Sequence, residues 1–195
     1  PGGRPAERMG PVLELRGDVG IAHDRPCDKL RKHGNIRRKV DEIPLRGRIT
    51  PVDIHNIAQN LEGVKADFVT NAVSHAQTLA KMGIRVYLIG GELKSSTEAV
   101  VGSQAMQMIQ MYHFTKGFFG TNGITRREGF TTPDTSEAIV KNTAMKQCKD
   151  VYILTDKSKF GEVSSVTFGG FTDAKILTEE IPKEYQDSKN ILKVK

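Results

Sequence analysis

Short apolar runs alternate with stretches of helical sequence from Asp67 onward, and this alternation constrains the fold more than any other feature of the chain. It is typical of α/β proteins, because each parallel strand needs a crossover, usually a helix, before the next strand. We predict a Rossmann-like, mostly parallel sheet flanked by helices. The expected strands cover residues 67–70, 85–89, 115–119, 150–156, 163–168, 175–178 and 191–194, and the expected helices cover residues 52–61, 72–82, 102–112, a stretch beginning near Asp134, and weakly 182–186. Residues 92–101 fit either a strand or a loop.

Polar residues or glycines follow four of these predicted strands. The strand ends carry Thr70-Asn71, Gly90-Gly91, the loop Gly120 to Gly123, and Asp156 with Lys159. Ligands of parallel sheets gather beyond the carboxyl ends of the strands, so these four ends are expected to form one crevice. Taken singly, each glycine is better explained as a tight turn, and the binding interpretation gains weight from the convergence of the four ends.

The stretch from Gly120 to Gly161 is the centre of this predicted crevice. A flexible loop of glycines and hydroxyl residues leads into a helix capped by Asp134 or Thr135, with Glu137 reaching back to the cap. Unpaired backbone N–H groups and the helix dipole would together form an anion site. Glycine loops, hydroxyls and Lys159 suit a phosphate monoester on a small polyol, and Asn71, Glu137 and Asp156 could bond its sugar hydroxyls.

The net charge of +6 comes almost entirely from the N-terminal quarter. Residues 1–50 hold 12 of the 29 Lys and Arg but only 7 of the 23 Asp and Glu. Residues 51–195 are therefore nearly neutral and have no electrostatic footprint for a polyanion. The basic stretch Lys29 to Lys39 fits two interpretations, a phosphate-binding arm that could contact nucleic acid, or a solvated linker.

Other features exclude several classes of protein. The two cysteines, Cys27 and Cys148, have no metal-type Cys/His spacing around them, and Cys148 is expected to be a small buried thiol at the end of a helix. No apolar run is long enough to span a bilayer, and there is no signal pattern at the N-terminus. We expect a cytoplasmic protein that needs neither metal nor cofactor.

The order of the motifs resembles the effector-binding domain of the DeoR family of bacterial transcriptional repressors. The resemblance covers about residues 57–178 and rests on Val69-Thr70-Asn71, Leu88 to Leu93, Gly102, Phe118 to Ile124, Gly129-Phe130-Thr131, Glu137 to Lys141, and Asp156 to Gly161. It is most similar to members that control sugar phosphotransferase operons, of the fructose or lactose type. The resemblance implies a fold like ribose-5-phosphate isomerase, glucosamine-6-phosphate deaminase and the CoA transferases, a homo-oligomer, a phosphorylated sugar as effector, and operator DNA as partner. The ligand-binding residues that we expect are Thr70, Asn71, Gly90, Gly91, Gly120, Thr121, Asn122, Gly123, Thr131, Glu137, Lys141, Asp156 and Lys159.

Two features depart from the family pattern. Residues 1–50 do not resemble the winged helix-turn-helix that family members carry at this end, and Thr50-Pro51-Val52-Asp53 stands where the family has a Gly-Thr-Thr type phosphate loop. We therefore divide the chain into a basic segment, residues 1–50, and an effector-binding α/β domain, residues 51–195. One hypothesis is that residues 1 to about 50 are not the natural family sequence.

The competing interpretation is a sugar-phosphate isomerase or deaminase on the same fold. Proton abstraction next to a carbonyl needs a carboxylate base. In the isomerases the loop that matches Gly120 to Gly123 is rich in aspartates, and here it has none. Glu137 resembles the isomerase's helix-start glutamate, but a capping role explains it equally well. These residues favour a sensor over an enzyme.

Overall fold

A computed structural model describes residues 67–194, and it confirms the predicted α/β class. The first parallel pair joins β1 (Phe68–Thr70) to β2 (Val86–Leu88), with α3 (Val73–Lys81) as the crossover. The second sheet is parallel and has the order β11-β10-β8-β5, made by β5 (Phe114–Gly120), β8 (Cys148–Leu154), β10 (Lys175–Thr178) and β11 (Ile191–Lys193). Within residues 67–194, β1 and β5 each pair on one side only.

Two antiparallel pieces, which the sequence did not reveal, complete the described fold. The first is a hairpin of β3 (Glu92–Lys94) and β4 (Ala99–Val101) in the stretch that fitted either a strand or a loop. The second joins β6 (Gly123–Thr125), β7 (Gly129–Thr132) and β9 (Val166–Gly169), so the loop predicted after β5 leads directly into a hairpin. Two short 3-10 turns, η2 (Lys157–Lys159) and η3 (Lys183–Tyr185), follow β8 and β10.

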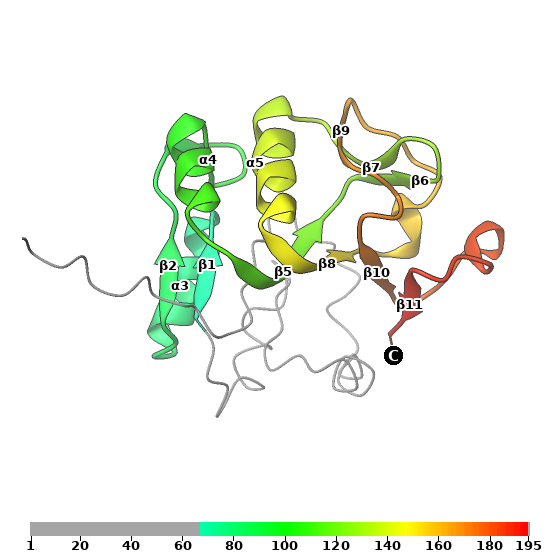
Figure 1. Cartoon of the computed structure of the whole chain (residues 1–195), viewed down its shortest axis with the longest axis horizontal. Coiled ribbons are helices and arrows are strands. Elements are labelled where there is room, and N and C mark those ends of the chain that lie inside the picture. The colour runs from blue at the N-terminus through cyan, green and yellow to red at the C-terminus, as the bar shows by residue number, and fades with distance from the viewer. Residues whose placement is uncertain (1–66, 195) are drawn as a thin grey trace, which may run out of the picture.

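The helices lie where the hydrophobic spacing predicted them. Helix α4 (Ser103–Gln110) buries Ala105 and Ile109, and α5 (Thr135–Lys146) packs beside it. Figure 1 shows α3, α4, β1 and β2 at one end, α5 in the middle, and the β6-β7-β9 sheet towards the other end. A single hydrophobic core connects the two parallel sheets through members such as Val69, Ile109, Phe119, Phe130 and Ile176.

Cys148 begins β8 instead of ending a helix, because α5 stops at Lys146. Its thiol is half-buried and donates to the Ala144 carbonyl, with Sγ and O 3.1 Å apart. Burial raises the pKa of the Cys148 thiol to about 12, so the residue stays protonated and unreactive at neutral pH. Its role is packing.

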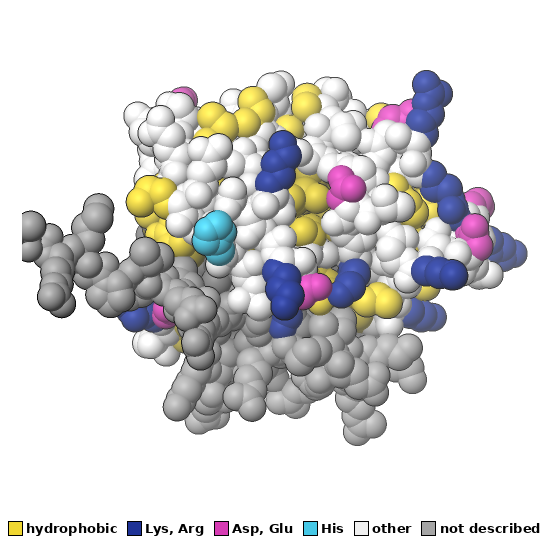
Figure 2. All heavy atoms as spheres, in the orientation of Figure 1, with side chains coloured by type: hydrophobic (Ala, Val, Ile, Leu, Met, Phe, Trp, Pro, Cys, Tyr) yellow, Lys and Arg dark blue, Asp and Glu magenta, His cyan; other side chains and the backbone are white. Residues whose placement is uncertain are grey.

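Charged side chains on the visible face are scattered, with acidic and basic groups interspersed (Figure 2). This agrees with the nearly neutral composition after residue 50 and gives the described part of this face no basic patch. None of the helices between residues 67 and 194 is both long and apolar enough to cross a bilayer. The predictions for residues 1–50, and for a helix over residues 52–61, lie outside the described residues.

Candidate functional site

The N-terminus of α5 is capped as the sequence predicted. Asp134 has extended backbone angles, and its Oδ1 accepts from the backbone N–H of Glu137 at 2.9 Å. The Glu137 side chain, however, does not reach back to the cap as predicted. It points to the β3–β4 hairpin, where its Oε1 accepts from Lys94 Nζ at 2.8 Å and from Thr97 Oγ1 at 3.0 Å.

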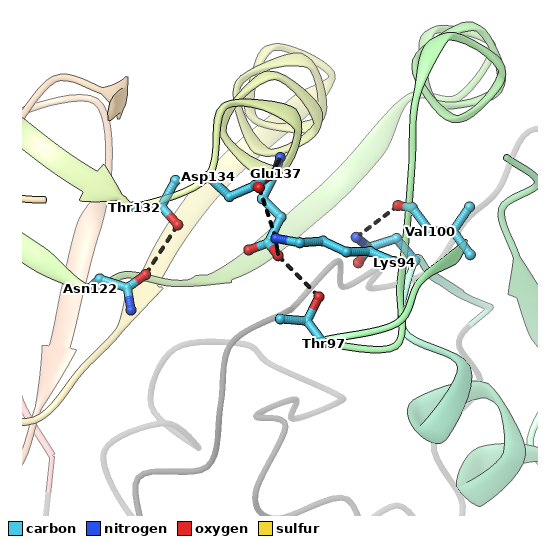
Figure 3. Close-up of polar contacts among 8 residues, drawn as sticks. Lys94, Thr97, Val100, Asn122, Thr132, Asp134 and Glu137 are labelled. Carbon is cyan, nitrogen blue, oxygen red and sulfur yellow. Dashed lines mark hydrogen bonds and ion pairs between the residues drawn. The ribbon is translucent and has the colours of Figure 1, made fainter. Parts of the chain in front are cut away.

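Lys94 therefore bridges two carboxylates at the start of α5 (Figure 3). Its Nζ lies 2.9 Å from Asp134 Oδ2, and the Glu137 side chain is only 5% exposed. The hydrogen bond from Lys94, followed by that from the Glu137 backbone, lowers the pKa of Asp134. Partial burial alone would lower the pKa of Lys94, but its hydrogen bonds to Glu137 and Asp134 raise it. We call Lys94, Thr97, Asp134 and Glu137 the Lys94 network.

This network occupies the α5 N-terminus, and the predicted anion site there stays a prediction. The favourable position for an anion is already taken by the carboxylate of Asp134, with that of Glu137 one turn further on. The two carboxylates share one ammonium, so the Lys94 network carries a net negative charge. A phosphate group would be repelled there, whereas hydroxyl groups could donate to the carboxylates.

The loop from Gly120 to Gly123 is held by bonds within the protein. The Thr121 hydroxyl lies 2.9 Å from the Gly123 carbonyl and 3.0 Å from that of Thr131, and it can donate to either. Thr131 Oγ1 accepts from the Ser164 N–H at 2.9 Å. A Cβ on Gly123 would lie 2.4 Å from the Glu162 carbonyl oxygen, so close backbone packing explains this glycine. Thr121, Gly123 and Thr131 thus shape the hairpin.

Asn122 connects the same loop to the end of β7, and Lys141 connects it to α5. Asn122 Oδ1 accepts from Thr132 Oγ1 at 3.1 Å, two residues before the Asp134 cap, and Figure 3 shows this pair beside the Lys94 network. Lys141 is buried, and its Nζ donates to the Gly120 carbonyl at 3.0 Å while lying 5.1 Å from the centre of the Phe168 ring. Lys141 therefore fastens the end of β5 to α5.

The end of β1 reaches the site through the β3–β4 hairpin. Thr70 Oγ1 accepts from the Ala72 N–H at 3.1 Å, which closes a local turn. The Val100 N–H donates to the Asn71 carbonyl at 2.7 Å, and Asn71 Nδ2 donates back to the Val100 carbonyl at 3.3 Å. Asn71 and the Lys94 network are thus joined by one hairpin.

The remaining predicted residues lie in two other places. The Gly90 N–H contacts Met108 Sδ of α4 at 3.3 Å, and Gly91, with a φ of 149°, packs against β4. Asp156 caps η2 by accepting from the Ser158 N–H at 2.7 Å, and the same segment contacts β6 where the Gly161 N–H donates to Ile124. Lys159, the last residue of η2, is half-buried. A role of these four residues in ligand binding stays a prediction.

Sequence reasoning missed Lys94, Thr97 and Thr132 as members of the site. Lys94 and Glu137 are separated by 43 positions, and no local spacing rule connects them. The one available signal was Glu137 itself, because a carboxylate buried near a helix start requires a cation or several donors.

Comparison with known proteins decides the family. A family model described as the DeoR C terminal sensor domain matches residues 54–180. The chain belongs to the DeoR family. The resemblance predicted from the sequence motifs is therefore confirmed, and the described domain is the sensor domain of that family.

Two relatives illustrate the match to the DeoR family. The uncharacterized HTH-type transcriptional regulator FruR of Bacillus subtilis is 43% identical over 129 residues, which cover 65% of this chain and 51% of the relative. A lactose phosphotransferase system repressor of Staphylococcus epidermidis is 31% identical over 113 residues, covering 56% of this chain and 44% of the relative. The chain spans about half the length of these curated relatives.

Solved structures add weaker likenesses to this DeoR sensor domain. Ribose 5-phosphate isomerase A of Methanocaldococcus jannaschii gives a TM-score of 0.40 at 8% identity, covering 76% of this chain and 49% of that one. The eIF2B delta protein of Chaetomium thermophilum gives a TM-score of 0.42 at 15% identity, covering 74% and 43%. The relatives at higher identity are named as transcriptional regulators and repressors.

Proposed function

We propose that this sensor domain binds a phosphorylated sugar in the crevice around the Lys94 network, and that binding changes the affinity of the whole protein for operator DNA. The observation that carries the proposal is the sensor-domain match over residues 54–180. Relatives named for a lactose phosphotransferase system and for the glycerol-3-phosphate regulon support a phosphorylated small polyol as the effector.

The charges and hydrogen bonds of the site support binding without reaction. The Glu137 carboxylate already accepts from Lys94 and Thr97, and Asp134 caps a helix while pairing with Lys94. A general base needs a carboxylate that can turn to a substrate proton. The described site therefore favours a sensor over the isomerase or deaminase alternative.

Linkage provides the proposed mechanism. Side-chain bonds join the end of β1 to the β3–β4 hairpin, through Asn71 and Val100, and join that hairpin to α5, through Lys94 and Glu137. A ligand that bonds one arrangement of these pieces better than another shifts the population towards it. In the complete protein such a shift changes operator affinity, by at most the difference in ligand-binding free energy between the two arrangements. Assembly into a homo-oligomer, which would transmit the shift between copies, stays a prediction.

A thermal-shift screen with fructose 1-phosphate, fructose 6-phosphate and tagatose 6-phosphate tests this proposal. A ligand at one hundred times its Kd stabilises the native state by about 2.7 kcal/mol. For a chain of this size that raises Tm by roughly 5–10 °C. The unphosphorylated sugars and inorganic phosphate serve as controls and should give much smaller shifts. If no ester raises Tm more than its unphosphorylated sugar does, the proposed function is wrong.

A further inference from the structure

Asn71 carries a buried hydrogen-bond acceptor that has no partner among residues 67–194. The residue is 3% exposed, and its Oδ1 atom is buried and accepts no hydrogen bond from this part of the chain. The orientation of the amide is set by the Val100 carbonyl, which requires the Nδ2 donor on its side and so directs Oδ1 away from it. Buried polar atoms are nearly always paired in native proteins. A buried acceptor without a partner therefore indicates a hydrogen-bond donor from outside the described residues.

The position of Asn71 identifies the kind of donor. Asn71 bonds Val100 of β4, and the preceding residue of that strand, Ala99, pairs with Lys94 of β3. Asn71 is thus bonded to strand β4 of the hairpin, and Lys94 belongs to the paired strand β3. The ammonium of Lys94 already pairs with two carboxylates. The side-chain groups that could bond a ligand here are therefore the acceptors, Asn71 Oδ1 and the carboxylate oxygens. Hydroxyl groups donate to acceptors, whereas a fully ionised phosphate has only acceptor oxygens.

We propose that Asn71 Oδ1 accepts a hydrogen bond from a hydroxyl of the effector, and that the wall formed by β1, the β3–β4 hairpin and the start of α5 is the hydroxyl-reading side of the site. The phosphate of the effector lies away from this wall. The proposal rests on the proposed function and deepens it, because it states that Asn71 recognises the sugar part of the ligand and not its phosphate.

The test compares Asn71→Leu with Asn142→Leu in the full chain. Asn142 is the matched control, since its Nδ2 also donates to a backbone carbonyl, that of Phe168 at 2.9 Å, but this carbonyl belongs to β9 and not to the β3–β4 hairpin. The probes are inorganic phosphate and whichever of the three esters gives the largest thermal shift in the wild type. Calorimetry should show the ester binding about tenfold more weakly to Asn71→Leu and within twofold of wild type to Asn142→Leu. Affinity for inorganic phosphate should be the same in all three proteins.

A change on the ligand side keeps the proposal testable if Asn71→Leu does not fold. Analogues of the chosen ester that each lack one hydroxyl group are titrated into the wild type, and one of them should bind about tenfold more weakly than the parent ester. Where Asn71→Leu does fold, that analogue and the parent ester should bind it with equal affinity. Unchanged ester affinity in Asn71→Leu, an equal loss for inorganic phosphate, or wild-type affinity for every deoxygenated analogue would each overturn the proposal. If no ester binds the wild type, the proposed function itself fails and this inference falls with it.

Discussion

Replacing Lys94 with Met is expected to lower the free energy of unfolding by about 3 kcal/mol, because it leaves a buried carboxylate without its cation. Among the described residues, Glu137 then keeps the Thr97 hydroxyl as its side-chain donor, and the Asp134 carboxylate also loses the ammonium with which it pairs. Met preserves most of the apolar volume of the lysine stem, so the change reports the charge. Urea unfolding at pH 7 measures it.

The control for Lys94→Met is Lys157→Met. Lys157 also pairs with one glutamate, Glu180, but both side chains are more than half exposed, and the expected loss is at most about 0.5 kcal/mol. Adding Glu137→Gln to Lys94→Met removes the stranded charge and should restore at least half of the lost stability. Equal losses for Lys94→Met and Lys157→Met would show that the Lys94 network does not hold the hairpin to α5.

The same network sets a pH dependence with a definite sign. The pKa of Asp134 is lowered in the folded state, so its contribution to stability is present above the pKa of an unfolded aspartate, about 3.9, and disappears as the pH falls through the folded value. The pKa of Lys94 is raised, so its contribution is lost only as the pH rises above about 10.4. Between pH 4.5 and 3, Lys94→Met should therefore lose less stability than the wild type does.

Gly91→Ala is expected to destabilise the domain by about 3 kcal/mol, whereas Gly90→Ala should change stability by less than about 0.5 kcal/mol. Gly91 has a φ of 149°, and a Cβ there would lie 2.5 Å from the Val101 carbonyl oxygen. A Cβ on Gly90 would meet nothing within 4 Å. The two neighbours thus form a matched pair, with the measurement again by urea unfolding.

The contrast also separates two explanations of a glycine pair at a strand end. Gly91 is required by the packing of β4, and its predicted role in ligand binding stays a prediction. Gly90→Ala keeps the fold and places a methyl group at the strand end, so it tests the predicted binding role of Gly90 without a loss of stability. Equal destabilisation by both substitutions would contradict the packing argument.

Local patterns in the sequence were enough to predict the parallel strands and the cap of α5. Runs such as Val151-Tyr152-Ile153-Leu154 are apolar on both faces, and Asp134 stands one position before a helix-forming stretch. Such signals act within a few residues, and they need no knowledge of the partner. Asn71, too, could be placed at a strand end, although its unpaired Oδ1 could not be foreseen.

The two hairpins and the Lys94 network could not be predicted, because they depend on partners far away in the chain. Strands β3 and β6 have only three residues each, and β3 is exposed on two of its three positions, so no alternating pattern distinguishes them. The turn between β3 and β4 holds Glu98 at a positive φ of 55°. A positive φ is uncommon for residues other than glycine, so the sequence does not predict it for a glutamate. The bond from Lys94 to Glu137 likewise depends on how the hairpin packs against α5.

A ³¹P NMR titration of the full chain with fructose 1-phosphate, fructose 6-phosphate and tagatose 6-phosphate tests most directly whether the domain binds a sugar phosphate without converting it, because one spectrum reports both binding and turnover. We expect at least one ester to show a saturable shift or broadening of its resonance, and its spectrum to return unchanged when the protein is removed. Unperturbed resonances for all three esters would contradict it. So would conversion of an ester to an isomer that is abolished by Glu137→Gln, since the domain would then be an enzyme.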